Sequence, residues 1–331
     1  MRVLMLGRKS SWMGLHISHI EAAFRRRGHQ IRVEDYHRMA SFCGIPLPRK
    51  LADEQRERSL ERLVKQFRPD LIYCIASWKY DFSRLKSYYR GVVAIHDLDG
   101  PHNPEERVLA AFRQVDLPLT ASQYMLRRAE AAGVRAFYLP SAADPDYYAP
   151  MELAADDRRR FGAPVSYIGR ATKRRVVFCS VLAEKGLALY GDRWRTNSYS
   201  REAGLDRCSR LSRNVAGREL VKIYQASGAV INILQEPLDQ FRTILSLQCF
   251  AVPSTGSCLI AEEVEEAAAA FEPGKEILLF HTPEELLEQV ERCLAEPEFA
   301  AGIGAAGRRR CLGCHTHDHR VAELERLLKN G

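Results

Sequence analysis

The 331-residue chain lacks long hydrophobic runs. A membrane-spanning helix needs about eighteen consecutive apolar residues, and no stretch of the sequence comes close to that length. The first apolar run ends at Gly7 and is too short for the core of a signal peptide. Low-complexity segments and short-period repeats are also missing. We therefore expect a globular, cytoplasmic protein without a transmembrane segment, whose nine cysteines are reduced thiols.

Two glycine-rich signatures of nucleotide binding are missing where they would carry meaning. No G-x-G-x-x-G follows a predicted strand, and the P-loop pattern G-x-x-x-x-G-K-[ST] is absent. A nicotinamide-dependent oxidoreductase is therefore disfavoured. Hydrophobic residues make up 46% and charged residues 27% of the chain, which is typical of a folded globular protein.

Positive charge is in excess, with a net charge of +7. The basic runs lie at 25–27, 158–160, 173–175 and 308–310, near helix ends and loops, and aromatic residues do not alternate with them. Proteins that bind single-stranded nucleic acid usually combine a basic groove with stacking aromatics. We therefore expect small anionic ligands rather than nucleic acid.

Strand-like and helix-like segments alternate from residue 2 to residue 139 and again from 165 onward. Alternation of this kind predicts parallel sheets covered by helices on both faces. A turn-rich stretch with three prolines, 140–150, interrupts the pattern. The sequence therefore predicts an α/β protein with two Rossmann-like parallel-sheet domains, 1–150 and 151–315, that face a cleft.

The stretch from Val165 to Trp194 predicts a phosphate site. An apolar run ends at Gly169, a basic loop follows, a helix begins near Arg175, and a second apolar run closes at Gly191. Helix amides and their dipole attract anions at such a junction. The loop adds four cationic donors suited to a diphosphate, although a solvated basic turn explains them equally well: Arg170, Lys173, Arg174 and Arg175.

A second group of candidates follows the predicted strand at 92–95. His96, Asp97 and Asp99 lie where a general base would be placed, with the aspartates preferred. The alternative is that both aspartates cap a turn and the next helix, which are common roles of aspartate.

The loop after the first predicted strand offers donors for an acceptor or a phosphate. Lys9, Ser10 and Ser11 carry the polar groups, and Gly14 allows close approach of a backbone. A plain connection between a strand and a helix is an equally good interpretation.

The segment C-L-G-C-H at 311–315, with His317 and His319, has the spacing of a metal-binding or haem-attachment motif. Haem attachment is disfavoured without an export signal. We favour a helix break at Gly313, followed by a new helical turn at 315–319, over zinc binding, and we assign no metal site.

Six stretches together resemble the GT-B glycosyltransferases, specifically the CgeB-like (spore-maturation-type) branch of the group 1 glycosyltransferases. They cover most of the second half of the chain: 139–148, 156–175, 187–194, 219–233, 271–280 and 306–320.

The resemblance implies a hexosyltransferase that moves a sugar from a nucleotide-diphosphate donor to an unidentified acceptor. It implies that the loop Gly169–Arg175 faces the donor diphosphate and that Tyr190 and Gly191 line the nucleotide. It also implies that the last helix, within 316–331, crosses back to the first domain. No protein-bound divalent metal is required, because the basic loop can balance the charge of the diphosphate.

The chain departs from the R-x-F-E-x-P-A-C-G pattern of that family. Gln248 stands at the position of the arginine and Ala251 at that of the glutamate, a ribose ligand in the family. Glu262, at the start of a helix expected over 262–271, is a substitute donor ligand. A helix is also expected near 241–250. The alternative function is a catalytically inactive homologue that binds a nucleotide sugar or acts as a scaffold.

Overall fold

A computed structural model describes residues 1–7, 14–35, 41–42, 45–46, 48–75, 81–236 and 238–330. The chain divides into an N-terminal unit, Met1–Ser141 with His317–Gly331, and a C-terminal unit, Ala142–Thr316. The boundary precedes residue 150 because the turn-rich stretch packs on the second unit, where Tyr148 is completely buried in the core.

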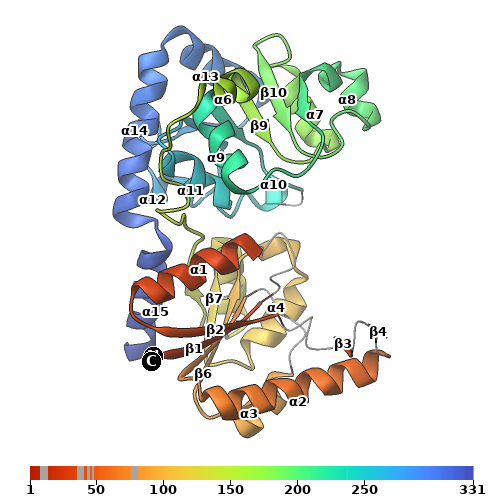
Figure 1. The fold of residues 1–331 in the computed structure, drawn as a ribbon, viewed down its shortest axis with the longest axis vertical. Coiled ribbons are helices and arrows are strands. Elements are labelled where there is room, and N and C mark those ends of the chain that lie inside the picture. The colour runs from red at the N-terminus through yellow and green to blue at the C-terminus, as the bar shows by residue number, and fades with distance from the viewer. Residues whose placement is uncertain are drawn as a thin grey trace. The chain divides into compact units, whose positions relative to one another are not determined.

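The N-terminal unit is built on a six-stranded parallel sheet in the order β2-β1-β5-β6-β7-β8 (Figure 1). Its continuously buried strands contain runs of aliphatic residues, as expected for a sheet covered on both faces. The strands are β1 (Arg2–Leu6), β2 (Gln30–Glu34), β5 (Leu71–Ile75), β6 (Val92–Asp97), β7 (Leu117–Thr120) and β8 (Phe137–Tyr138). A separate hairpin pairs β3 (Ser41–Phe42) with β4 (Ile45–Pro46).

Alternate residues of β1 point to opposite faces of the N-terminal sheet, and each face is covered by its own helices. Val3 and Met5 pack against α1 (Gly14–Arg26) and α15 (His317–Asn330). Leu4 and Leu6 point the other way and pack in the core that four further helices cover. These helices are α2 (Arg49–Phe67), α3 (Phe82–Tyr88), α4 (Glu105–Phe112) and α5 (Gln123–Ala131).

The C-terminal helix α15 is an integral part of the N-terminal unit. Val321, Leu324 and Leu327 lie in the core with α1. Ion pairs add to this contact, with Arg26 2.7 Å from Asp318 and Arg27 2.8 Å from Glu325. The unit is therefore assembled from the two ends of the sequence.

The C-terminal unit has a second six-stranded parallel sheet, in the order β11-β10-β9-β12-β13-β14. Counted within the unit the order is 3-2-1-4-5-6, which is the Rossmann order with its reversal between β9 and β12. The strands are β9 (Ala163–Ile168), β10 (Leu187–Tyr190), β11 (Ser209–Leu211), β12 (Ser227–Asn232), β13 (Leu259–Glu262) and β14 (Leu278–Phe280).

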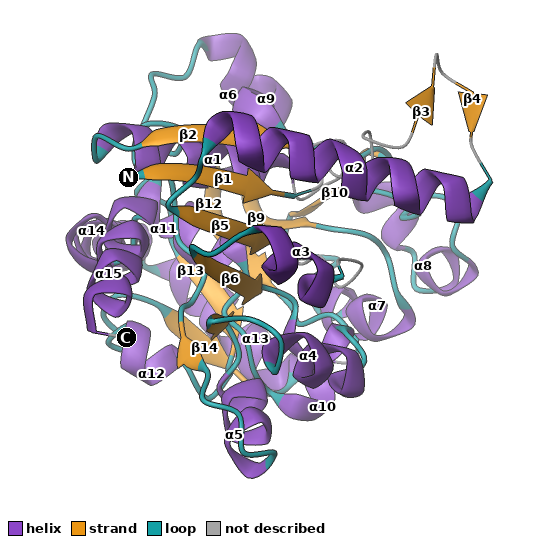
Figure 2. Cartoon of the chain, turned by 90° about the horizontal axis from the view of Figure 1, so that it is seen from below, coloured by secondary structure: helices purple, strands orange, loops and turns teal. Residues whose placement is uncertain are grey.

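Two hydrophobic clusters fill the faces of this second sheet. The first joins α6 (Ala155–Phe161), α9 (Gly217–Ala226) and α11 (Leu247–Ser254) to one face. The second joins α7 (Lys173–Ser180) and α13 (Pro283–Ala295) to the other. Figure 2 shows the alternation of helices and strands along the chain. Shorter helices are α8 (Ser198–Glu202), α10 (Leu238–Phe241) and α12 (Ala267–Ala270).

Two helix predictions in the C-terminal unit are wrong in extent. The expected helix at 241–250 is replaced by α10, an irregular loop and α11. The expected helix at 262–271 shrinks to α12, and Glu262 is the last residue of β13 instead of a helix start. Two buried carboxylates explain both changes. Glu262 accepts the amide of Leu234 and Glu266 accepts that of Ile244, and these tertiary contacts override local helix propensity.

The C-L-G-C-H segment ends a helix. Helix α14 (Pro297–Cys314) runs through Gly313, so the break expected there falls at His315 and Thr316 instead. Cys311 is buried and its Sγ lies 3.5 Å from the carbonyl oxygen of Phe250, whereas Cys314 is exposed. Nε2 of His315 lies 2.8 Å from the carbonyl oxygen of Ala270. No group of three or more metal-ligating side chains occurs among the described residues.

Histidines are buried between α1, β6 and α15. Nδ1 of His96 accepts the hydroxyl hydrogen bond of Tyr73 at 2.5 Å, and its Nε2 donates to the carbonyl of Leu139 at 2.7 Å. Burial lowers the pKa of His96 to about 4. Burial, with the nearby His19 and His96, lowers the pKa of His16 to about 4 as well. The pKa of His317 lies well below its usual value for the same main reason.

These histidines predict a loss of stability in acid. In the unfolded chain each takes up a proton near pH 6.5, whereas the folded unit keeps His16 and His96 neutral down to about pH 4. Between these values the free energy of unfolding should fall by about 1.4 kcal/mol per pH unit for each histidine. Urea unfolding measured across this range tests the slope, and His16→Gln should make it shallower. An unchanged slope in that variant would contradict the assignment.

Candidate functional site

Hydrogen bonds join the loops after β9 and β10 at the carboxyl edge of the C-terminal sheet. The amide of Gly169 donates to the carbonyl of Tyr190 at 2.9 Å, and that of Ala171 donates to Asp192 at 3.0 Å. The indole of Trp194 donates to the carbonyl of Gly169 at 2.8 Å. Gly191 has a φ of 129°, and a Cβ there would overlap the carbonyl oxygen of Gly169. Only glycine therefore permits this approach of the two loops.

Helix α7 begins directly after these joined loops. Thr172 caps it, with its Oγ1 accepting the amide of Arg175 at 3.3 Å. The amides of the first helical turn have no carbonyl partner within the helix, and their partial positive charge favours an anion. The predicted junction of strand, loop and helix is therefore present.

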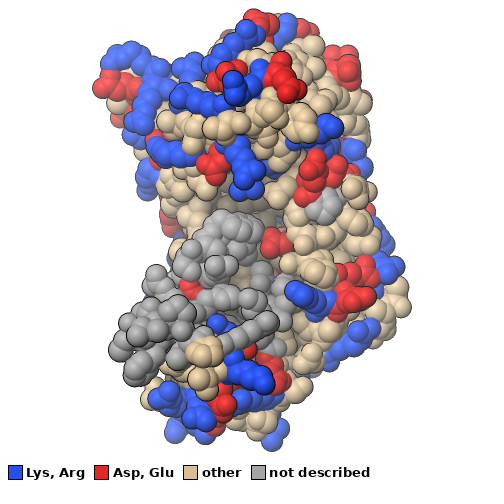
Figure 3. Space-filling model, turned by 90° about the vertical axis from the view of Figure 1, so that its right-hand side faces the viewer, with Lys and Arg blue, Asp and Glu red and all other residues tan. Residues whose placement is uncertain are grey.

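Three cations of this loop have no carboxylate partner in the described part of the chain. Arg170 and Lys173 are exposed, and the Lys173 ammonium lies 5.4 Å from the centre of the Tyr199 ring. Arg175 donates to the carbonyls of Arg170 and Ile233 at 3.3 and 3.4 Å, and its buried Nε has no hydrogen-bond partner. Figure 3 shows Lys and Arg side chains gathered on the face of this unit that carries α7 and α8.

Arg174 differs from the other three cations, because two carboxylates hold it. Its guanidinium forms a bidentate ion pair with the Glu262 carboxylate, in which Nη1 lies 2.9 Å from Oε2. Its Nε lies 3.2 Å from Asp239. The sequence grouped Arg174 with the phosphate donors, but in the structure its charge is balanced inside the protein.

Glu262 is occupied in the same way. Its side chain is fully buried, and it accepts the amide of Leu234 at 3.0 Å in addition to the Arg174 guanidinium. The carboxylate thus connects the end of β13, the loop after β12 and the start of α7. Both oxygens already have donors, so a ribose hydroxyl would have to displace one of them.

The two substituted positions of the family pattern have structural roles here. Gln248 accepts from the side-chain amide of Asn232 at 2.7 Å and donates to the carbonyl of Ile168 at 3.0 Å. It thereby joins the carboxyl ends of β9 and β12. Ala251 is buried in the core of α11, where a carboxylate would have no water. Tyr190 is also a core residue, and its hydroxyl donates to the carbonyl of Phe161 at 3.1 Å.

The loop between α10 and α11 was not found from the sequence. Arg242 and Ile244 have positive φ values of 44° and 75°, which are uncommon for residues other than glycine and rarest for a β-branched residue such as Ile244. Glu266 is buried and holds the loop, accepting the Thr243 hydroxyl at 2.5 Å and the Ile244 amide at 3.0 Å. Strained backbone of this kind is concentrated at functional sites. No pattern of residue types signals it, because backbone angles depend on the buried glutamate.

Asp97 of the N-terminal unit holds a turn. One carboxylate oxygen accepts the amide of Gly100 at 3.0 Å and the side-chain amide of Asn103 at 2.9 Å. The other accepts the hydroxyl of Thr120 at 3.3 Å. Burial raises the pKa of Asp97 to about 6 even so. This geometry matches the turn-capping alternative, and His96 has both ring nitrogens engaged in hydrogen bonds.

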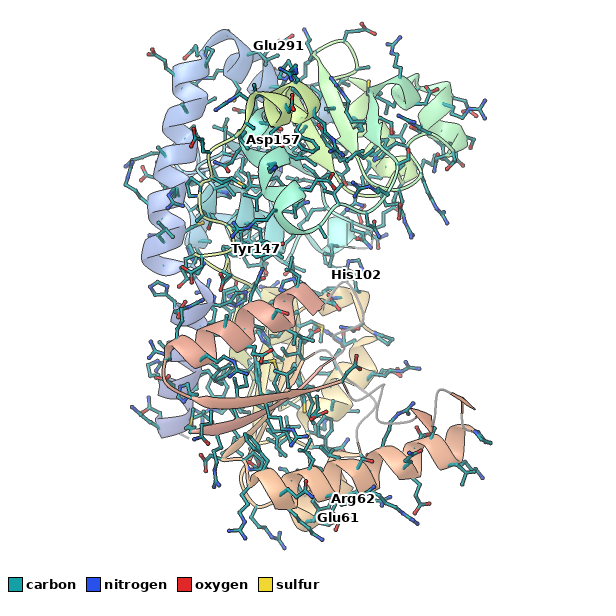
Figure 4. All side chains as sticks on the ribbon, viewed as in Figure 1. Glu61, Arg62, His102, Tyr147, Asp157 and Glu291 are labelled. Carbon is teal, nitrogen blue, oxygen red and sulfur yellow. The ribbon has the colours of Figure 1, made fainter. Side chains whose placement is uncertain are left out.

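Asp99 is the candidate base with an available carboxylate. It is partly exposed, and no hydrogen bond or ion pair to its carboxylate is found within the described ranges. Burial, followed by the neighbouring charge of Asp97, raises the pKa of Asp99 to about 6. The 3-10 helix η2 (Gly100–His102) follows directly, and Figure 4 labels His102.

The structure describes only part of the predicted loop after β1. Lys9, Ser10 and Ser11 lie outside the described residues. Gly14 is the first residue of α1, and its carbonyl accepts the Ser18 hydroxyl at 2.9 Å. Their assignment to an acceptor or phosphate stays a prediction.

Comparisons with solved structures define the class of fold. Sucrose-phosphate synthase from Thermosynechococcus elongatus has a TM-score of 0.74 at 14% identity, over 99% of this chain and 98% of that chain. HepE from Anabaena in complex with UDP-glucose has a TM-score of 0.73 at 15% identity, over 100% of both chains. A glycosyltransferase from Rickettsia africae has a TM-score of 0.71 at 11% identity, over 99% and 98%. The fold is therefore GT-B.

The sequence agrees with this fold over the second half of the chain. Residues 170–326 match the family model described as glycosyl transferase-like. A search of curated proteins found none that matches. Within the described ranges, no helix has the length and apolar character needed to cross a membrane.

The buried pair of Arg174 and Glu262 predicts a large effect of removing one partner. Glu262→Gln should destabilise the protein by about 1–3 kcal/mol, because the Arg174 guanidinium loses one of its two carboxylate partners and keeps Asp239. The double variant Arg174→Met with Glu262→Leu should lose less than Glu262→Gln alone. Guanidinium unfolding of the three proteins measures this. Equal losses in the single and double variants would show that the pair does not couple.

Proposed function

We propose that this protein is a glycosyltransferase that moves a sugar from a nucleotide-diphosphate donor to an acceptor. The observation that carries the proposal is a set of three cations beside the start of α7 that have no carboxylate partner among the described residues: Arg170, Lys173 and Arg175. Guanidinium and ammonium groups beside helix amides suit a diphosphate, whose charge grows as the sugar leaves. The family model that residues 170–326 match supports the same activity.

The bond changes of the proposed reaction assign a task to each group. The bond between the anomeric carbon and the diphosphate oxygen breaks, and an acceptor oxygen bonds to that carbon and loses its proton. The cations would stabilise the departing nucleoside diphosphate. Asp99 would take the acceptor proton, because its carboxylate is available and its raised pKa makes it a better base than an ordinary aspartate.

The donor is proposed to be a uridine diphosphate hexose. HepE, which shares the fold over the whole chain, has been solved with UDP-glucose and with UDP and glucose. We also place the chain in the CgeB-like branch, on the strength of the stretches at 156–175 and 271–280.

A non-catalytic, nucleotide-sugar-binding protein is the second candidate. Ala251 cannot hold a ribose, and the mutual pairing of Arg174 and Glu262 removes two polar groups that would otherwise face the donor. Such a protein would bind UDP through the three available cations and fail to turn over its sugar.

The first test concerns the diphosphate. The double variant Arg170→Gln with Lys173→Gln should weaken UDP binding at least tenfold, since each charged hydrogen bond contributes about 1.5–3 kcal/mol. Isothermal titration calorimetry measures this. The matched control replaces two exposed cations of the same unit, Arg158→Gln with Arg309→Gln, and should bind as the unaltered protein does. A control that loses as much affinity would mean that only overall charge matters.

The second test concerns the base. Asp99→Asn should lower transfer or donor hydrolysis about 10²–10⁴-fold without changing UDP affinity. In the unaltered protein the rate should rise as the pH passes about 6 and level off above it, because only the ionised carboxylate accepts a proton. Turnover of UDP-sugars by the Asn variant at an undiminished rate would exclude Asp99. UDP binding with no turnover by either protein would favour the non-catalytic candidate.

A further inference from the structure

An open groove of about 500 Å³ lies in the N-terminal unit, at the amino ends of its strands. It is formed by the start of β1, the connection from α2 to β5 and the connection from α3 to β6. Asp97 and Asp99 follow the carboxyl end of β6, so they belong to the opposite edge of the same sheet. The groove is thus separate from the site proposed for sugar transfer.

All the charged residues that line this groove are cationic. Arg2, Lys65, Arg68 and Arg90 contribute to it, and no Asp or Glu does. Glu61, labelled in Figure 4 on α2, lies one helical turn before Lys65 and 2.6 Å from its ammonium. The groove therefore presents an excess of positive charge to solvent.

Two of these cations are not balanced by any acidic group. Arg2 pairs with Asp70 at 3.8 Å, and Lys65 pairs with Glu61. Arg68 and Arg90, in contrast, form neither a hydrogen bond nor an ion pair through their side chains within the described ranges, and both are exposed. Two guanidinium groups are therefore available for a ligand, and each can bind a phosphoryl group with two parallel hydrogen bonds.

The backbone at Arg68 is unusual for a side chain of this size. Arg68 ends α2 with a φ of 50° and a ψ of 59°, and its amide donates to the carbonyl of Val64 at 2.8 Å. Glycine is the ordinary residue at such a left-handed helix end, because it adopts the conformation without strain. An arginine in its place puts a guanidinium at the groove in spite of that strain.

Tyr88 adds a neutral aromatic side chain to the same lining. Its hydroxyl is buried and has no hydrogen-bond partner within the described ranges, and burial beside Glu57 and Glu61 raises its pKa, so it stays protonated. Gly91 lines the groove as well, and a Cβ there would overlap the hydroxyl of Tyr89. The groove therefore combines guanidinium groups with the aromatic side chains of Tyr88 and Tyr89.

We propose that this groove binds a ligand that carries two or more phosphoryl groups. The available guanidinium groups of Arg68 and Arg90 would each bind one phosphoryl group, while Arg2 and Lys65 add to the positive potential. The same chemistry is offered by a soluble polyphosphorylated molecule and by anionic phospholipid headgroups at a membrane surface. The proposal does not depend on the sugar-transfer activity.

Inositol hexakisphosphate serves as the soluble probe in calorimetry with the full chain. The variant Arg68→Gly removes a guanidinium and suits the left-handed backbone, so its melting temperature should equal or exceed that of the unaltered protein. Its affinity for the probe should fall about tenfold, and Arg90→Gln should act similarly. The matched control, Arg107→Gln with Arg113→Gln, removes two exposed cations of the same unit outside the groove and should keep the affinity.

Vesicles distinguish the two sources of the phosphoryl groups. Cosedimentation with phosphatidylglycerol vesicles but not with phosphatidylcholine vesicles, lost in Arg68→Gly and kept in the control, would assign the groove to a membrane surface. Binding of the soluble probe alone would assign it to a free ligand. The proposal is overturned if neither probe binds, or if the control variant loses as much affinity as Arg68→Gly.

Discussion

The paired charges of Arg174 and Glu262 determine how the carboxyl edge of the C-terminal sheet is built. The carboxylate ends β13, accepts the amide of Leu234 after β12 and binds the guanidinium at the start of α7. One buried ion pair therefore fixes three segments that are distant in sequence. Its removal from water is costly, and the cost is recovered only because every oxygen has a donor.

This internal pairing also distinguishes Arg174 from the other cations of the basic loop. Arg174 is neutralised within the protein, whereas Arg170, Lys173 and Arg175 have no carboxylate partner among the described residues. The loops that carry them are held in place by backbone hydrogen bonds and by the Trp194 indole rather than by a ligand. A site formed in this way is preorganised, and a bound diphosphate would not have to order it.

Most of the fold could be predicted from the sequence, because apolar runs alternate with helical periods over both halves. The extent of elements was less predictable where buried carboxylates hold loops, as Glu262 and Glu266 do at the predicted helices over 241–250 and 262–271. For the site, the basic loop was visible as a cluster of residue types. The separation of Arg174 from its neighbours was not, because its partner lies 88 positions away.

The sequence by itself determined the class of fold: two α/β units, a strand, loop and helix at Gly169, and a second half that resembles glycosyltransferases. These follow from local periodicity and short motifs, which nearby residues encode. Only the tertiary structure decided which charges are available. It buried His96, engaged Asp97 in a turn, and left the Asp99 carboxylate without a partner among the described residues. It also brought Arg68 and Arg90 into the lining of one groove. Charge availability depends on distances between segments that are far apart in the chain, and no local pattern contains that information.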